Sequence, residues 1–106
     1  MIKLSDKLLM ETFTIYYVYC LACKTSHRIN THKPNKYGFT WIWDLIVEKP
    51  SFFPDLKIYH ADGGVCHSVI VSGKVIYDKR STHEMKGTVV DLPDFPKEVL
   101  EELLLE

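Results

Sequence analysis

The chain has 106 residues, of which 46% are hydrophobic and 25% charged, and its formal net charge is −1. This composition excludes a disordered chain, and its balance of charges gives no sign of nucleic-acid binding. The longest apolar run, residues 15–23, falls short of the ~18 residues of a membrane-spanning helix, and Asp6 and Lys7 interrupt any signal-peptide core. We therefore expect a single cytoplasmic domain over residues 1–106, with no membrane association.

The first half of the chain is predicted to be mostly extended. After an N-terminal extension at residues 1–11, β-branched and aromatic residues over 12–19 predict a strand, and residues 25–31 a short return strand. Proline, asparagine and glycine predict a loop over 32–38. Alternation over 39–43 predicts another strand, which places Phe39, Trp41 and Trp43 on one face. Two further prolines, at 50 and 54, predict an extended passage at a sheet edge or in a loop.

The second half contains the clearest hairpin and the only predicted helix. In residues 67–78, two runs of β-branched residues flank Ser72-Gly73, a two-residue turn with a glycine available for positive φ. Residues 88–91 predict a last strand. Residues 96–106 predict a helix with Asp94 close enough to cap it, and its Leu-rich end suggests a homodimer contact. The fold class expected is therefore mainly β (α+β), with about six short antiparallel strands and a C-terminal helix.

Three cysteines form the most informative pattern in the sequence. An odd count cannot be fully paired in disulfides, and no secretory context supports a disulfide framework. Cys20 and Cys23 are separated by two residues at the end of a predicted strand, which suits half of a zinc knuckle. Cys66 follows at another strand boundary, directly before His67. These four residues would make a closed Cys3His zinc site, which contributes folding free energy to a small domain.

The fourth ligand is open to alternatives. His67 is favoured because its neighbour belongs to the set, although adjacent residues on a regular strand point to opposite faces. His27 would give Cys-x-x-Cys-x-x-x-His, and His83 lies in a polar loop. His32 and His60 are assigned no role. The competing interpretations are three cysteines buried as small apolar residues, and a redox pair, which would need a βαβ pattern that the sequence lacks.

Familiar zinc motifs do not fit these spacings. The finger that reads DNA needs about twelve residues between its second cysteine and first histidine, and here His27 follows Cys23 after three. The deaminase pattern places a His-x-Glu ahead of its cysteine pair, and the chain has none. No His-Glu-x-x-His motif, phosphate-binding glycine loop or Gly-x-Ser-x-Gly elbow occurs either.

The order of motifs resembles a known family. Cys-x-x-Cys with a histidine four positions on is followed by Trp-x-Trp, Lys-Pro-Ser, a Cys-His-Ser hairpin, Thr-His and Val-Asp-Leu-Pro-Asp-Phe-Pro, over about residues 16–96. The pattern is similar to a small domain family of unknown function, found in tailed phages and bacteria and often mislabelled "ammonia monooxygenase". The resemblance implies a phage source and a zinc-binding β-rich fold. It also implies metal candidates at Cys20, Cys23, Cys66 and His67, with His27 and His83 at recurrent positions.

Three functions are compatible with these observations. The leading hypothesis is a phage-encoded accessory protein in the host cytoplasm, stabilised by zinc, which binds a protein partner and inhibits a host enzyme or defence factor. An alternative is a zinc hydrolase in which three cysteines hold the metal, water takes the fourth place, and His67 or His83 acts as general base. A third is a module that binds single-stranded nucleic acid through the basic segment 24–36 and the two tryptophans. The overall charge makes nucleic acid the less favoured partner.

Overall fold

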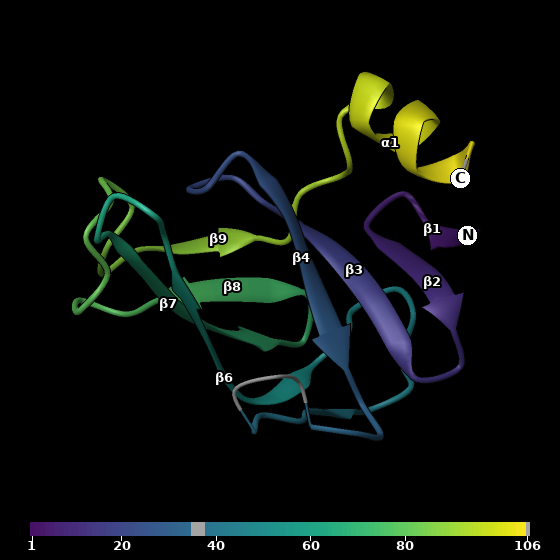
Figure 1. Cartoon of the computed structure of the whole chain (residues 1–106), viewed down its shortest axis with the longest axis horizontal. Helices are drawn as coiled ribbons and strands as arrows, with labels where there is room; N and C mark the ends of the chain where they lie inside the picture. The colour runs from purple at the N-terminus through teal and green to yellow at the C-terminus, as the bar shows by residue number, and fades with distance from the viewer. Residues whose placement is uncertain (35–37, 106) are drawn as a thin grey trace.

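Two antiparallel sheets form the body of the protein. The structure is a computed structural model that describes residues 1–34 and 38–105. Within those residues the first sheet has four strands in the order β1-β2-β3-β4, and the chain enters it at its N-terminus (Figure 1). These strands are β1 (Ile2–Ser5), β2 (Leu8–Thr12), β3 (Ile15–Cys20) and β4 (Thr25–Asn30).

The second sheet has five strands in the order β5-β6-β7-β8-β9 in the described chain. They are β5 (Ile42–Trp43), β6 (Phe52–Tyr59), β7 (Val65–Val71), β8 (Lys74–Tyr77) and β9 (Val89–Asp91). The predicted hairpin is confirmed as β7 and β8, with Ile70 opposite Val75. Ser72 and Gly73 both have positive φ, at 48° and 75°, as the tight two-residue turn requires. The mainly β fold class is thus confirmed.

The strands differ from the expectation in number and length. The segment 1–11, expected as an extension, supplies β1 and most of β2, and its Leu8 and Leu9 are fully buried. The strand β6 continues past Pro54 because the proline lies where the register shifts between Phe52 and Leu56, and a missing N–H is tolerated at such a bulge. Of the loop expected at 32–38, residues 35–37 lie outside the described residues.

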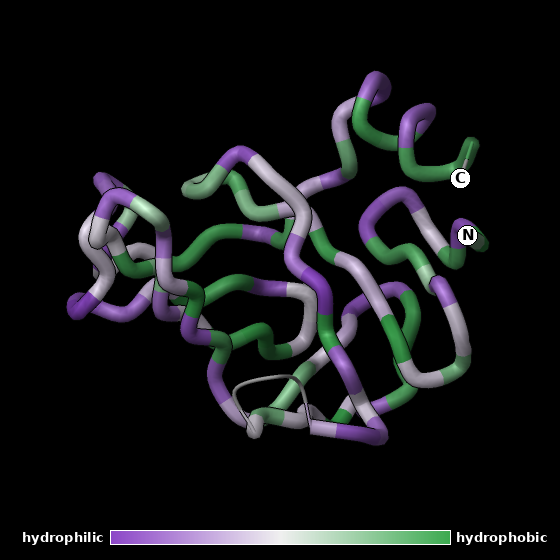
Figure 2. Tube along the Cα trace, in the orientation of Figure 1, coloured by the Kyte–Doolittle hydropathy of each residue, from purple (hydrophilic) through white to green (hydrophobic). Residues whose placement is uncertain are grey.

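The main core lies between the two sheets, where the hydrophobic stretches of both face one another (Figure 2). The tryptophans belong to this core. Trp41 is buried, and Trp43 is half-buried against Tyr16 and Phe52, with ring centroids 4.7 and 6.0 Å away. Neither ring is therefore free to act as a platform on which nucleic-acid bases stack.

The predicted helix is confirmed as α1 (Lys97–Leu104), which lies beside β1 and β2 (Figure 1). Its apolar face, formed by Val99, Leu100 and Leu103, packs on a second small cluster that contains Leu9 and Phe95. Asp94 does not cap the helix as expected. Pro96 occupies the cap position without a side-chain bond, and Asp94 instead pairs with Lys7 at 3.1 Å. No helix in the described part of the chain is long and apolar enough to span a membrane.

Candidate metal centre

Three cysteines and one histidine meet where the two sheets face each other. One ligand atom from each of Cys20, Cys23, His27 and Cys66 lies within 4.8 Å of the other three. The first three come from the β3–β4 hairpin, and Cys66 comes from β7 in the opposite sheet. Cys20, His27 and Cys66 are buried, whereas Cys23 is partly accessible. The site therefore brings together side chains of both sheets that can each offer one ligand atom to a metal ion.

The hairpin places its three ligands on one side by its register. Cys20 is opposite Thr25 in the β3–β4 ladder, and His27 lies two residues further along β4 and so shares the face of Thr25. The turn that follows Cys20 is closed by a bond from the Lys24 N–H to the Cys20 carbonyl, at 2.8 Å. Within this turn the Cys23 N–H donates to the Cys20 sulfur at 3.3 Å. The amide thereby stabilises negative charge on that sulfur.

The spacing of the sulfurs suits a tetrahedral metal ion. The Sγ atoms of Cys20 and Cys66 are 3.9 Å apart, and all three cysteines are free. Two zinc–sulfur bonds of about 2.3 Å at the tetrahedral angle would place their sulfurs about 3.8 Å apart. His27 completes the donor set, because its Nε2 atom is buried and has no hydrogen-bond partner. A buried nitrogen without a partner is costly unless a cation binds it.

The protonation states of the three thiols also favour a cation. Hydrogen bonds from Cys23 and Cys66 hold the pKa of Cys20 far below its ordinary value. The same bonds, made to Cys20, raise the pKa of Cys23 to about 12 and raise the pKa of Cys66 further. The three thiols therefore differ in acidity, and the charge of the Cys20 sulfur is stabilised by its two sulfur neighbours. Three thiolates at this separation require a bound positive charge, and zinc binds thiolate and imidazole in this combination.

No protein-family model matches the chain, and the searches of curated proteins and of solved structures found no match. The structure shows a small β domain with a Cys3His cluster that could bind a metal ion.

His67, the favoured fourth ligand, does not join the cysteines, and His27 takes that place. His67 follows Cys66 on the regular strand β7, so its side chain points to the opposite face of the sheet. There its Nε2 contacts the Asp55 carboxylate, and its Nδ1 lies 4.0 Å from Asp78. The contact with Asp55 keeps the pKa of that carboxyl below its usual value. The contacts around His67 thus belong to the outer face of the second sheet.

His83, the other alternative, is also outside the cluster. Its ring meets Tyr77 edge-on with centroids 5.0 Å apart, and its Nδ1 accepts the N–H of Met85 at 3.2 Å. Tyr77 in turn lies beside the metal centre, with its hydroxyl 3.3 Å from the Cys20 sulfur. Burial, followed by this contact, raises the pKa of Tyr77, so the hydroxyl keeps its proton for donation to Cys20.

Sequence reasoning missed His60. Its Nε2 lies 3.2 Å from the Cys23 sulfur, yet no spacing motif contains it. The available signal was Gly63-Gly64, which lies in the turn between β6 and β7. This turn folds the chain back and places His60 near Cys66, the residue of β7 that belongs to the cluster. Tyr77 and His60 thus surround the cluster with polar groups, as is usual around metal ligands.

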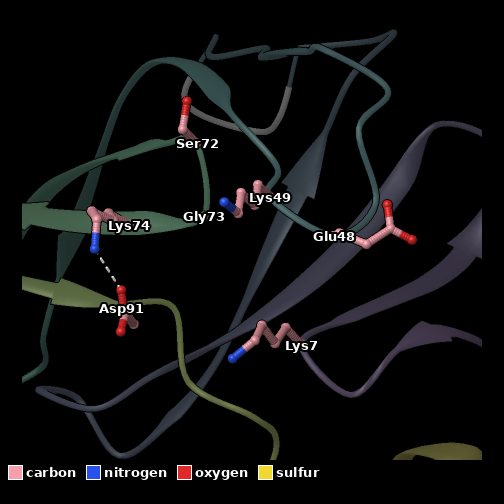
Figure 3. A pocket seen from close by; sticks show the side chains of 7 residues that line it. All are labelled: Lys7, Glu48, Lys49, Ser72, Gly73, Lys74 and Asp91. Carbon is pink, nitrogen blue, oxygen red and sulfur yellow. Dashed lines mark hydrogen bonds and ion pairs between the residues drawn. The ribbon is translucent and has the colours of Figure 1, made fainter.

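Several open clefts in the described part of the chain contain none of the four cluster residues, and two of them are lined by charged side chains. One, of about 300 Å³, includes His67, Asp55 and Asp78. The other has a volume of about 310 Å³ and lies beside the β7–β8 turn (Figure 3). Two of its lysines are already paired, Lys74 with Asp91 at 2.7 Å and Lys7 with Asp94 at 3.1 Å. This second cleft is lined by Lys7, Glu48, Lys49, Ser72, Gly73, Lys74 and Asp91.

Proposed function

We propose that the protein is a phage-encoded accessory protein in the host cytoplasm whose zinc centre stabilises a surface that binds a host protein, such as an enzyme or defence factor. The observation that carries this proposal is the closed set of four protein ligands joining the two sheets. Such a set suits a structural site, because no coordination position is left for a substrate or a water molecule. The phage source rests on the order of motifs in residues 16–96.

Zinc fits the donor set better than the other common ions. Calcium and magnesium take oxygen ligands, and the cluster offers three sulfurs and one nitrogen. Zinc accepts this combination in a tetrahedral arrangement without preference from its d electrons. We therefore assign zinc as the bound ion, held by Cys20, Cys23, His27 and Cys66.

The two alternative functions find less support. A hydrolase would need an open position on the metal, and the His27 nitrogen lies where that position would be. The proposed general bases lie outside the cluster: His67 contacts Asp55 on the opposite face of β7, and the Nδ1 of His83 accepts the Met85 N–H. A nucleic-acid module would need exposed aromatic rings, whereas both tryptophans belong to the core.

A surface for a protein partner lies beside β5. Ile42 is 71% exposed and stands opposite the exposed Phe53 in the β5–β6 ladder, so the two side chains share a face. Leu45, which is 75% exposed, lies two residues beyond the end of β5 and has a φ of 67°. A leucine in the left-handed region of backbone conformation costs conformational energy. We call Ile42, Leu45 and Phe53 the β5 surface and propose that it contacts the partner.

The backbone at Leu45 supplies a stability prediction. Leu45→Gly should raise the free energy of unfolding by about 0.5–1 kcal/mol, because glycine adopts positive φ without strain and little buried area is lost. Ile46→Gly, at the next exposed apolar position and without positive φ, should instead lower it. Urea denaturation of both variants measures the difference. A less stable Leu45→Gly variant would contradict the strain argument.

Capture of bacterial host proteins on the immobilised, zinc-loaded chain tests the proposed function. We expect a partner that binds the natural chain and is lost with Ile42→Asp, since a buried charge at the centre of an apolar contact is costly. Phe13→Asp is the matched control, because Phe13 is 86% exposed and lies in the β2–β3 turn. A partner that binds all three proteins equally would argue against the β5 surface.

The end of α1 supports a proposed homodimer. Leu105 is 87% exposed and Leu104 also reaches the surface, beyond the apolar face that packs on the domain. We expect sedimentation to show a dimer that Leu105→Glu converts to monomer, because two like charges would meet at the contact. A natural chain that sediments as a monomer at high concentration would contradict this proposal.

A further inference from the structure

Cys23 differs from the other three ligands in its exposure. Cys20, His27 and Cys66 are buried, whereas Cys23 is only partly covered. A chelator or an oxidant that approaches from solvent therefore meets the Cys23 sulfur first. The residue that covers this sulfur governs how fast the metal can leave.

His60 is the residue placed against that sulfur. Its Nε2 lies 3.2 Å from the Cys23 Sγ, within the range of an N–H···S hydrogen bond. Nε2 is not one of the four atoms that gather in the cluster. His60 is therefore placed to bond to a ligand of the metal and not to the metal itself.

Backbone hydrogen bonds in the turn that contains His60 fix the position of this residue beside Cys23. The His60 N–H donates to the Gly64 carbonyl at 2.8 Å, and the Gly63 N–H donates back to the His60 carbonyl at 3.0 Å. Gly64 fits tightly in this turn, because an added Cβ would lie 3.0 Å from the Asp62 Oδ1 and 3.1 Å from the Thr82 hydroxyl oxygen. Thr82 in turn accepts the Val65 N–H at 2.8 Å, which fixes the start of β7.

We propose that His60 is a positioning residue of the metal centre, which donates its Nε2–H to the Cys23 thiolate and thereby slows release of the metal through Cys23. The inference rests on the proposed zinc site. Cys23 is then the ligand through which the metal exchanges, and His60 is the side chain that controls that exchange. The bond orients the sulfur, as hydrogen bonds from neighbouring side chains do for other metal ligands.

The test compares His60→Ala with the natural chain, using His32→Ala as the control at an exposed histidine. Transfer of zinc to an excess of a colorimetric chelator should be about tenfold faster for His60→Ala, the lower end of the effect of removing such a partner. In the cobalt-loaded protein the sulfur-to-cobalt charge-transfer band should move to longer wavelength, because the thiolate loses a hydrogen bond. His60→Gln retains an N–H and should restore part of both effects.

Two outcomes would overturn the inference. One is a His60→Ala protein that matches the natural chain and His32→Ala in both release rate and cobalt spectrum. The other is a His60→Ala protein that folds but no longer holds one zinc per chain, since His60 would then be a ligand of the metal. A natural chain that binds no metal would overturn the proposed zinc site together with this inference, whereas a metal-bound natural chain with an unaffected His60→Ala variant would overturn this inference alone.

Discussion

Removing the metal ion with a strong chelator is expected to unfold the domain. Structural zinc sites of this type contribute about 10–16 kcal/mol to folding, which equals or exceeds the net stability of about 5–15 kcal/mol that small domains retain. Three thiols and an imidazole would then remain at the junction of the sheets without a cation. Far-UV circular dichroism and the sharpness of amide proton signals would follow the loss of structure.

Restoring zinc provides the control for this experiment. Addition of one equivalent of zinc to the chelated chain under reducing conditions should recover the folded signal, because the three cysteines remain free to bind. A magnesium salt should not restore it, since magnesium prefers oxygen ligands. A chelated, metal-free chain with an unchanged spectrum and unchanged thermal stability would contradict a structural role for the metal.

His27→Ala is expected to abolish stoichiometric zinc binding, whereas His67→Ala should keep one zinc per folded chain. The His27 nitrogen belongs to the cluster, and the His67 nitrogens face Asp55 and Asp78 on the other side of β7. Loss of a protein ligand should weaken zinc affinity enough for the ion to be lost during gel filtration, because a water molecule would replace the His27 imidazole. Metal content after gel filtration, measured by elemental analysis, distinguishes the two variants.

His67 is buried, so its replacement also has a structural effect that must be separated from metal binding. Zinc content should therefore be normalised to the folded fraction, and His67→Asn serves as a milder variant that keeps a polar side chain near Asp55. His83→Ala should likewise retain the metal. Zinc loss in His67→Ala together with zinc retention in His27→Ala would reverse our assignment of the fourth ligand.

Local signals were enough to predict most of the second sheet. The β-branched runs on either side of Ser72-Gly73 specify a hairpin by themselves, and the helical spacing of Val99, Leu100 and Leu103 specifies α1. The first two strands lacked such signals. Leu8 and Leu9 are consecutive and both fully buried, because Leu8 packs in the main core and Leu9 packs beneath α1. Residues 2–12 therefore show no simple alternation of apolar and polar residues.

The sequence was enough to predict the three cysteines of the candidate site, but not which histidine joins them. Cys-x-x-Cys is a local motif, and Cys66 was the only thiol left to join it. The choice between His27 and His67 depends on the face toward which each side chain points. The register that pairs Val18 with His27, and the regular extension of β7 through Cys66 and His67, decide that question. His60 depends on a turn geometry that spacing alone does not reveal.

The division of the ligands between the two sheets has a consequence for the order in which the chain acquires its structure. Three ligands lie within eight residues of one hairpin, and the fourth lies 46 positions from Cys20. A nascent chain can capture an ion on the hairpin long before Cys66 has been synthesised. Closing a loop of this length costs about 3 kcal/mol in chain entropy, which the fourth metal bond offsets. An ion bound in this way would hold the hairpin ligands together before the second half of the protein folds against them.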